Sequence, residues 1–285
     1  MNNYNNQADI DQKNSTFWDE LCGTQLAKSL GVVDSSQESL AKFDSFYLNY
    51  YPYLKKYLCL DELNGKNVLE VGLGYGTVSQ LLALSGATYH GLDIAPNAVG
   101  MVNHRLQQHH LEGDVRVNSM LTCPFPDDYF DYVFSIGCFH HTGDMQACVN
   151  QTRRILKPGG KAIIMVYNQF SLRQWMCWPR LTVKNLLLQL TQKHNKKSNE
   201  SQRKAYDCSA SGSGAPETEF FSITELQTIF SKYNAIHVTR ENMDEKVITL
   251  KLGKIPLVRF GNRAQYLDSR LTRQLGLDLY IEAIK

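Results

Sequence analysis

The stretch "VLEVGLGYGT" (residues 68–77) decides the fold, because it joins a short apolar run to three closely spaced glycines. An apolar run of this length, bounded by glycines, is typical of a buried strand of a parallel sheet. Glycine adopts positive φ and lets the backbone approach a ligand closely. The stretch therefore predicts a strand, a tight loop and a helix, with a ligand at the loop.

The spacing of the glycines indicates which ligand the loop suits. A dinucleotide fingerprint that starts at Gly72 and Gly74 needs its third glycine at residue 77, but the sequence has Gly76 and Thr77. No Lys-Ser/Thr pair follows to make a phosphate-binding P-loop. Glu70 ends the apolar run, where an acid repels a pyrophosphate and suits a ligand that carries an ammonium and a sulfonium. The loop therefore favours a cationic ligand.

Strand and helix patterns alternate after this loop. Strands are expected at residues 65–72, 87–94, 114–120, 130–137, 161–167, 235–242 and 277–285, and helices at 78–85, 98–106, 148–156 and 222–233. Such alternation predicts right-handed crossovers and a mostly parallel, doubly wound α/β sheet with helices on both faces. Ligands of these sheets bind beyond the carboxyl ends of the strands.

Other segments lie outside the alternation. Helices are expected over 15–32 and 39–58, with Ser39 as a candidate cap, and over 256–275. The arginines on this last helix are expected to form a solvated face: Arg259, Arg263, Arg270 and Arg273. These patterns predict an N-terminal helical lid (1–60) and a sheet domain (61–285).

The sheet domain is interrupted after its fifth strand by an insertion, residues 168–220. This segment is aromatic and amphipathic at first and contains a flexible Ser/Gly run at 209–214. Val183, Leu186, Leu187 and Leu190 recur on one helical face. A packed helix is favoured for this stripe over an anchor at a membrane surface.

Composition excludes several classes of protein. A net charge of +2 over 285 residues gives no reason to expect a nucleic-acid partner. The seven cysteines are scattered and never form a CxxC pair, which argues against a disulfide framework or a metal site and favours reduced thiols in the cytoplasm. No apolar run approaches the ~20 residues of a spanning helix, and the first residues lack a signal-peptide pattern.

Five segments in order resemble the class I S-adenosylmethionine-dependent methyltransferases. They are "VLEVGLGYGT", "GLDIAP", "CPFPDDYFDYVFS", "GCFHHTGD" and "RRILKPGGKAIIMVYN", and they cover about residues 65–168. The resemblance implies a Rossmann-like fold with a seven-stranded sheet, S-adenosylmethionine as cofactor and S-adenosylhomocysteine as product. "FWDELCGT" and "HHTGD" resemble a subgroup that acts on small molecules.

The resemblance also implies the cofactor contacts. The methionine part would lie against Glu70, Gly72, Gly74 and Gly76, the ribose on Asp93, the adenine on Ile94 and Met120, and the amino end against backbone groups of Ile136 and Gly137. Asp93 ends the second strand, where acids of nucleotide-binding sheets accept ribose hydroxyls. Ser119 stands where family members often have Asp or Asn toward the adenine, with Asn118 beside it.

The acceptor side is less determined. His140 and His141 follow the fourth strand, so either could take a proton near pH 7 or only shape the pocket through hydrogen bonds. The lid and the insertion offer further candidates for the substrate side: Cys22, Thr24, Tyr47, Tyr51, Trp175 and Glu217. Each of these could instead be a packed or surface residue without a role in binding.

The sequence therefore predicts methyl transfer to a nitrogen or oxygen of a small molecule in secondary metabolism, with no nucleic-acid or membrane partner. It does not determine the oligomeric state. One alternative is a lipid or quinone methyltransferase that uses the 168–190 segment at a membrane surface. Another is a cofactor-binding regulator without catalysis. A nucleic-acid methyltransferase is disfavoured, because "GCFHHT" replaces the Asn/Asp-Pro-Pro-aromatic motif after the fourth strand.

Overall fold

A seven-stranded sheet organises the chain in a computed structural model that describes residues 2–21, 24–191, 198–244, 249–252, 255–259 and 261–285. Its strand order is β3-β2-β1-β4-β5-β9-β6, and β9 alone runs antiparallel to its neighbours. The strands are β1 (Asn67–Val71), β2 (Thr88–Asp93), β3 (Asp114–Val117), β4 (Phe130–Ile136), β5 (Leu156–Tyr167), β6 (Ala235–Glu241) and β9 (Asp278–Ile284). The predicted doubly wound, mostly parallel sheet is confirmed.

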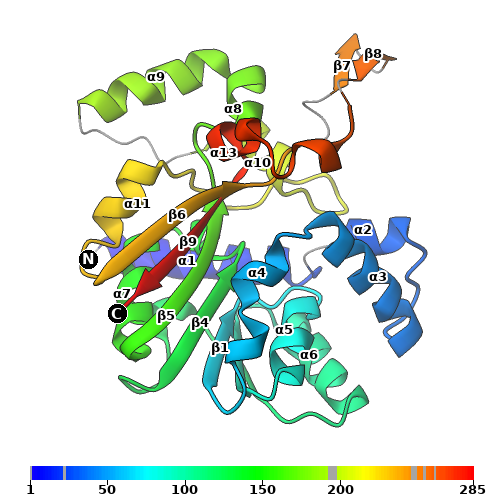
Figure 1. The fold of residues 1–285 in the computed structure, drawn as a ribbon, viewed down its shortest axis with the longest axis vertical. Coiled ribbons are helices and arrows are strands. Elements are labelled where there is room, and N and C mark those ends of the chain that lie inside the picture. Colours follow the sequence, from blue (N-terminus) through cyan, green and yellow to red (C-terminus); the bar gives the residue numbers. More distant parts are fainter. Residues whose placement is uncertain (1, 22–23, 192–197, 245–248, 253–254, 260) are drawn as a thin grey trace.

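Helices cover both faces of the sheet (Figure 1). One face packs against α4 (Leu54–Leu58), α5 (Thr77–Leu84) and α6 (Pro96–Gln108), and the other against α7 (Met145–Ile155) and α11 (Ile223–Ile229). Side chains of β4 alternate between these cores, with Tyr132 and Phe134 on the first face and Val133 on the second. This period of two is what a strand buried on both faces requires.

The remaining elements frame the sheet. The other helices are α1 (Asn2–Trp18), α2 (Thr24–Ser29), α3 (Gln37–Tyr50), α8 (Leu172–Cys177), α9 (Pro179–Leu190), α10 (Glu200–Tyr206) and α13 (Arg270–Leu275). Short 3-10 turns occur at η1 (Leu60–Glu62), η2 (Met120–Thr122), η3 (Phe139–His141) and η4 (Arg263–Tyr266). Strands β7 (Thr249–Leu252) and β8 (Ile255–Arg259) pair apart from the main sheet.

The N-terminal helices differ from the prediction. Helix α1 begins at Asn2, inside the polar tail, and ends at Trp18. A tertiary contact stabilises it, because the Ser15 hydroxyl donates to the carbonyl of Ile94, after β2, at 2.9 Å. Helix α3 is capped by Ser36, whose hydroxyl accepts from the backbone N–H of Ser39, so Ser39 lies inside the helix.

The prediction of a helix over residues 256–275 is wrong. Strand β8, η4 and α13 occupy this segment instead. Asn262 and Ser269 each cap a new turn by accepting a backbone hydrogen bond, and such residues favour helix starts over helix interiors. Arg270 and Arg273 are exposed as expected, but Arg263 is buried, and its Nε donates to the carbonyl of Met243 at 2.9 Å.

Helix α9 also contradicts the expected packing. Its inward side chains are the polar Thr182 and Asn185. The apolar stripe that was expected to pack faces outward instead: Val183, Leu186, Leu187 and Leu190 are between 40% and 76% exposed. The helix therefore presents an apolar outer face. No helix in the described part of the chain is long and apolar enough to cross a membrane.

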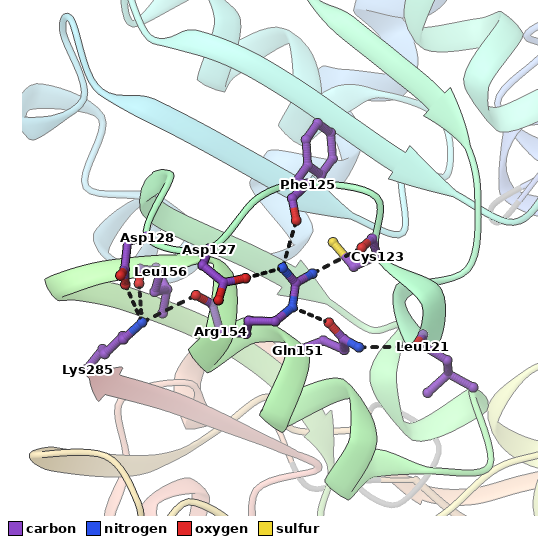
Figure 2. Close-up of polar contacts among 9 residues, drawn as sticks. All are labelled: Leu121, Cys123, Phe125, Asp127, Asp128, Gln151, Arg154, Leu156 and Lys285. Carbon is purple, nitrogen blue, oxygen red and sulfur yellow. Dashed lines mark hydrogen bonds and ion pairs between the residues drawn. The ribbon is translucent and has the colours of Figure 1, made fainter.

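Arg154, near the end of α7, binds the segment that precedes β4, at the amino-terminal ends of the parallel strands (Figure 2). Its guanidinium donates to the carbonyls of Phe125 and Cys123 and to the carboxylate of Asp127, at 2.7–3.0 Å. The Nζ of Lys285 reaches the carbonyl of Leu156 at 2.6 Å in the same region. These contacts fix the connection into β4 at the edge opposite the carboxyl ends of the strands.

A buried ion pair joins α3 to the sheet domain. The guanidinium of Arg105, on α6, is almost fully buried and donates to both oxygens of Asp44 at 2.8 and 3.0 Å. The hydroxyl of Thr77 donates to the same carboxylate at 2.5 Å. Gly76 makes room for this pair, because a Cβ there would lie 2.8 Å from Cδ of Arg105.

We predict that Asp44→Ala lowers the free energy of unfolding by about 3–5 kcal/mol, because it leaves the Arg105 charge buried without a counter-charge and with only the side-chain oxygen of Gln80 as a partner. Urea denaturation followed by circular dichroism measures the change. Glu38→Ala is the matched control on the same helix, since its partner Lys42 and Glu38 itself are exposed. The control should stay within about 0.5 kcal/mol of the wild type. Equal effects of both substitutions would contradict the role given to the buried pair.

Candidate active site

One pocket opens at the carboxyl ends of the parallel strands. All eleven residues that the sequence predicts for the cofactor line it: Glu70, Gly72, Gly74, Gly76, Asp93, Ile94, Asn118, Ser119, Met120, Ile136 and Gly137. They come from the ends of β1, β2 and β4 and from the turn after β3. Residues distant in sequence are thus brought together as the prediction requires, although their contact with a cofactor remains a prediction.

The loop after β1 depends on its glycines. Gly72, Gly74 and Gly76 have φ of +84°, +51° and +77°, in the region that side chains with a Cβ rarely adopt. A Cβ on Gly72 would lie only 2.4 Å from the Cβ of Cys138, which belongs to the loop after β4. The first glycine therefore allows two loops of the pocket to approach each other.

Asp93 connects the glycine loop to the end of β2. Its Oδ2 accepts from the backbone N–H of Leu73 at 2.7 Å, and its Oδ1 accepts from Ala95 at 2.8 Å. Burial raises the pKa of Asp93, and these backbone donors oppose the shift. Each carboxylate oxygen has a further lone pair for another donor, so the proposed contact with ribose hydroxyls is compatible with these bonds.

Glu70 makes the pocket floor acidic. Its side chain is 3% exposed, and its Oε2 accepts from the Tyr89 hydroxyl at 2.7 Å. Burial raises the pKa of Glu70 to about 7, and the nearby charge of Asp93 acts in the same direction. Among the described residues that line the pocket, none is Lys or Arg. The electrostatics therefore favour a cation and oppose a phosphate group.

The turn after β3 supplies the remaining expected contacts. The hydroxyl of Ser119 accepts from the backbone N–H of Leu121 at 3.3 Å and caps η2. Asn118 Oδ1 accepts from the Thr122 hydroxyl at 2.9 Å, and Met120 is buried. Both polar side chains thus have structural contacts in addition to the roles that the sequence predicts for them.

The two histidines after β4 have different environments. His140 is fully buried and is not among the pocket-lining residues, and burial lowers its pKa well below the usual range. His141 lines the pocket. Its Nδ1 donates to the carbonyl of Glu217 at 2.7 Å, and its Nε2 lies 3.6 Å from Oδ2 of Asp207. The carbonyl requires a proton on Nδ1, which assigns the tautomer from its partner.

Asp207 is a site residue that the sequence analysis missed. It is contributed by the insertion, and its Oδ1 accepts from the Tyr167 hydroxyl at 3.1 Å. Burial raises the pKa of Asp207, while the nearby His141 lowers it. The hydrogen bond from Nδ1 to Glu217 fixes the His141 ring in the pocket wall, and the carboxylate of Asp207 lies within ion-pair distance of Nε2. No local pattern around residue 207 indicates this pairing.

The lid candidates separate into two groups. Tyr47 lines the pocket, whereas Tyr51 packs behind it with ring centroids 4.9 Å apart. Trp175 and Glu217 are not among the lining residues. Cys22 lies outside the described residues, and Thr24 starts α2 but has no described side chain.

Helices α1 and α3 contribute lining residues that the sequence analysis did not select. These are Asp11, Asn14, Trp18 and Phe43. The first three are spaced by three and four residues, which places them on one face of α1. This spacing could have identified the face from the sequence, but the expected helix began only at residue 15, so the first part of α1 was not predicted to be helical.

Comparisons with known proteins find methyltransferases among the proteins that this chain resembles. Residues 69–164 match the family described as "Methyltransferase domain". Phosphoethanolamine N-methyltransferase 2 of Caenorhabditis elegans is 34% identical over 110 residues, which are 37% of this chain and 24% of that protein. Demethylmenaquinone methyltransferase of Tropheryma whipplei is 30% identical over 104 residues, 36% and 43% of the two chains. The chain thus spans less than half the length of these two relatives.

A solved structure extends the likeness in fold to most of the chain. It is a protein of Thermotoga maritima described as a methyltransferase and possible histamine N-methyltransferase. The two share 17% sequence identity with a TM-score of 0.51, and the match covers 86% of this chain and 95% of that one. At this identity the comparison shows the fold alone.

We predict that Glu70 makes stability depend on pH. Its pKa is near 7 in the folded protein and about 4.5 when unfolded, so the folded state holds the extra proton between these values. The free energy of unfolding should therefore fall, by an amount on the order of 3 kcal/mol, as pH rises from about 4.5 to about 7. Glu70→Gln should show a loss that is smaller by about this amount when denaturation is measured across that range, because Asp278, whose pKa burial also raises to about 7, keeps its own contribution. The exposed Glu282→Gln should follow the wild type, and a Glu70→Gln curve parallel to the wild type would contradict the prediction.

Proposed function

We propose that this chain, whose residues 69–164 match a methyltransferase domain, is a class I methyltransferase that transfers a methyl group from S-adenosylmethionine to a nitrogen or oxygen of a small molecule. One observation carries the proposal: the residues expected for the cofactor line a single pocket at the carboxyl ends of the strands. The donor set fits this cofactor, because Glu70 and Asp93 suit its ammonium, sulfonium and ribose hydroxyls. The same set suits a pyrophosphate poorly.

The cofactor supplies an activated methyl group when it is bound. The protein's part is to hold both reactants in line and to exclude water, which can provide most of the acceleration of a bimolecular reaction. The glycine loop and Asp93 fix one reactant. Helices α1 and α3 wall the other side with Trp18, Phe43 and Tyr47.

The catalytic part assigned to the histidines remains a proposal. His141 is the better placed of the two, because it lines the pocket and is held by Asp207 and Glu217. Its direct use as a base requires one of these partners to move. His140 would act through its neighbour, since its own ring is buried away from the pocket-lining surface.

The N-terminal segment 1–60 and the insertion 168–220 serve as the lid in this proposal. Support comes from α1 and α3, which supply lining residues, and from Asp207, which reaches a lining histidine. A cytoplasmic location and a role in secondary metabolism belong to the same proposal. The seven cysteines support this location, because they are scattered along the sequence and never form a CxxC pair.

A second candidate function is methylation of a lipid or quinone at a membrane surface. It is favoured by the exposed apolar face of α9, formed by Val183, Leu186, Leu187 and Leu190. Flotation of the protein with anionic vesicles tests it. Binding that is lost in Leu187→Glu but kept in Val33→Glu, an even more exposed apolar position elsewhere, would favour this second function.

We predict that the purified protein binds S-adenosylhomocysteine and not NAD. Asp93→Ala should weaken binding of S-adenosylhomocysteine by about 1–3 kcal/mol, the scale for losing hydrogen bonds to a charged group. Isothermal titration calorimetry measures both, with circular dichroism to establish that the variant is folded. Asp93→Asn keeps one acceptor oxygen and serves as a second variant, and the exposed Asp268→Ala is the control. Binding of NAD without binding of S-adenosylhomocysteine would overturn the proposed function.

A further inference from the structure

One face of α1 forms a wall of the pocket that the predicted cofactor residues also line. Asp11, Asn14 and Trp18 all line the pocket from this face. The helix is held across the carboxyl ends of the strands at two points. Near β4, the amide of Gln7 donates to the carbonyl of Thr142 at 2.9 Å, and near β2, Ser15 donates to Ile94. The three side chains are therefore held in place beside the loop after β4.

Asn14 lines the pocket and carries a buried acceptor without a partner among the described residues. Its Nδ2 donates to the carbonyl of His141 at 2.6 Å, which fixes the orientation of the amide and leaves Oδ1 as the other end. The residue is 4% exposed, and Oδ1 has no hydrogen-bond partner among the described residues. A buried oxygen without a donor is unfavourable. The site therefore calls for a ligand that donates a hydrogen bond here.

Asp11 and Trp18 specify the charge of that ligand. Asp11 Oδ1 accepts from the amide of Gln7 at 2.8 Å, and a carboxylate retains further acceptor capacity beyond this bond. The Trp18 ring packs against the ring of His141 with centroids 4.8 Å apart, and indole faces attract cations. Because none of the described lining residues is Lys or Arg, a phosphate or carboxylate would find no counter-charge in the pocket.

We propose that the methyl acceptor is an amine, cationic when free, whose N–H groups bind Asp11 and Asn14 beside the Trp18 ring. This inference rests on the proposed function and narrows it to N-methylation. The ammonium first releases one proton to water. The uncharged nitrogen then forms its bond to the methyl carbon while the carbon–sulfur bond breaks and leaves its electron pair on sulfur. The product is a methylated ammonium and a neutral thioether.

The test compares ligands that share a carbon skeleton and differ in charge. The probes are 2-phenylethylamine, 2-phenylethanol and 3-phenylpropanoic acid, with butylamine, butanol and butanoic acid as a smaller series. Each is titrated calorimetrically into the full chain saturated with S-adenosylhomocysteine. In at least one series, the amine is expected to bind tenfold or more tightly than the matched alcohol and acid. An alcohol or acid that binds as tightly as its amine, or no binding of either amine at 10 mM, overturns the proposal.

Variants of α1 test whether Asp11 causes the preference for the amine. Asp11→Asn should remove the tenfold preference for the amine, with circular dichroism to establish that the variant is folded. Asp9→Asn is the matched control, because Asp9 is exposed and paired with Lys13. The control should keep the preference. A preference that survives in Asp11→Asn, or is lost equally in Asp9→Asn, overturns the role of Asp11.

The two proposals fail separately. If S-adenosylhomocysteine does not bind the wild type, the proposed function is wrong, and the amine inference falls with it. If S-adenosylhomocysteine binds and the amines show no advantage, only the amine inference is wrong.

Discussion

The carboxylate of Asp93 is the contact on which the pocket depends. It accepts one backbone hydrogen bond from the glycine loop, at Leu73, and one from the start of α6, at Ala95. Two loops that follow different strands are thereby fixed against one side chain. The positive-φ glycines of the first loop place its backbone beside the cavity without side chains that would fill it. The proposed recognition of a ribose would use the oxygen lone pairs that this bracing leaves.

The buried carboxylates of the pocket lower the stability of the fold when they are ionised. Burial raises the pKa of both Glu70 and Asp93, so each ionised carboxylate opposes folding to some extent. The proposed cationic ligand would relieve this cost by favouring the charged forms. The buried pair of Arg105 and Asp44 lies close by and stabilises the helices that carry the loop. The ion pair beside the pocket thus stabilises the fold, while the two carboxylates in the pocket can interact with a ligand.

Much of the sheet and of its pocket follows from local sequence, because both are set by short patterns. Apolar runs bounded by glycine located the strands, and Glu70 and Asp93 were recognisable as acids at strand ends. The errors arose where tertiary contacts decide the outcome. Nothing local shows that Arg263 is buried, since its partner Met243 lies in a different part of the fold. The outward apolar face of α9 is also invisible locally, because periodicity locates a face without saying which way it points.

The acceptor side was the hardest part to predict, because it is assembled from three distant parts of the chain around His141. Asn14 of α1 binds the backbone of this residue, while Asp207 and Glu217 of the insertion face its ring nitrogens. A motif search sees only the histidine, since its partners lie more than sixty residues away on either side. The sheet positions the cofactor residues by a pattern that many sequences share. Selectivity for the acceptor must then come from the added segments, and in this chain the unpartnered oxygen of Asn14 and the carboxylate of Asp11 give those segments a preference for a donor that carries positive charge.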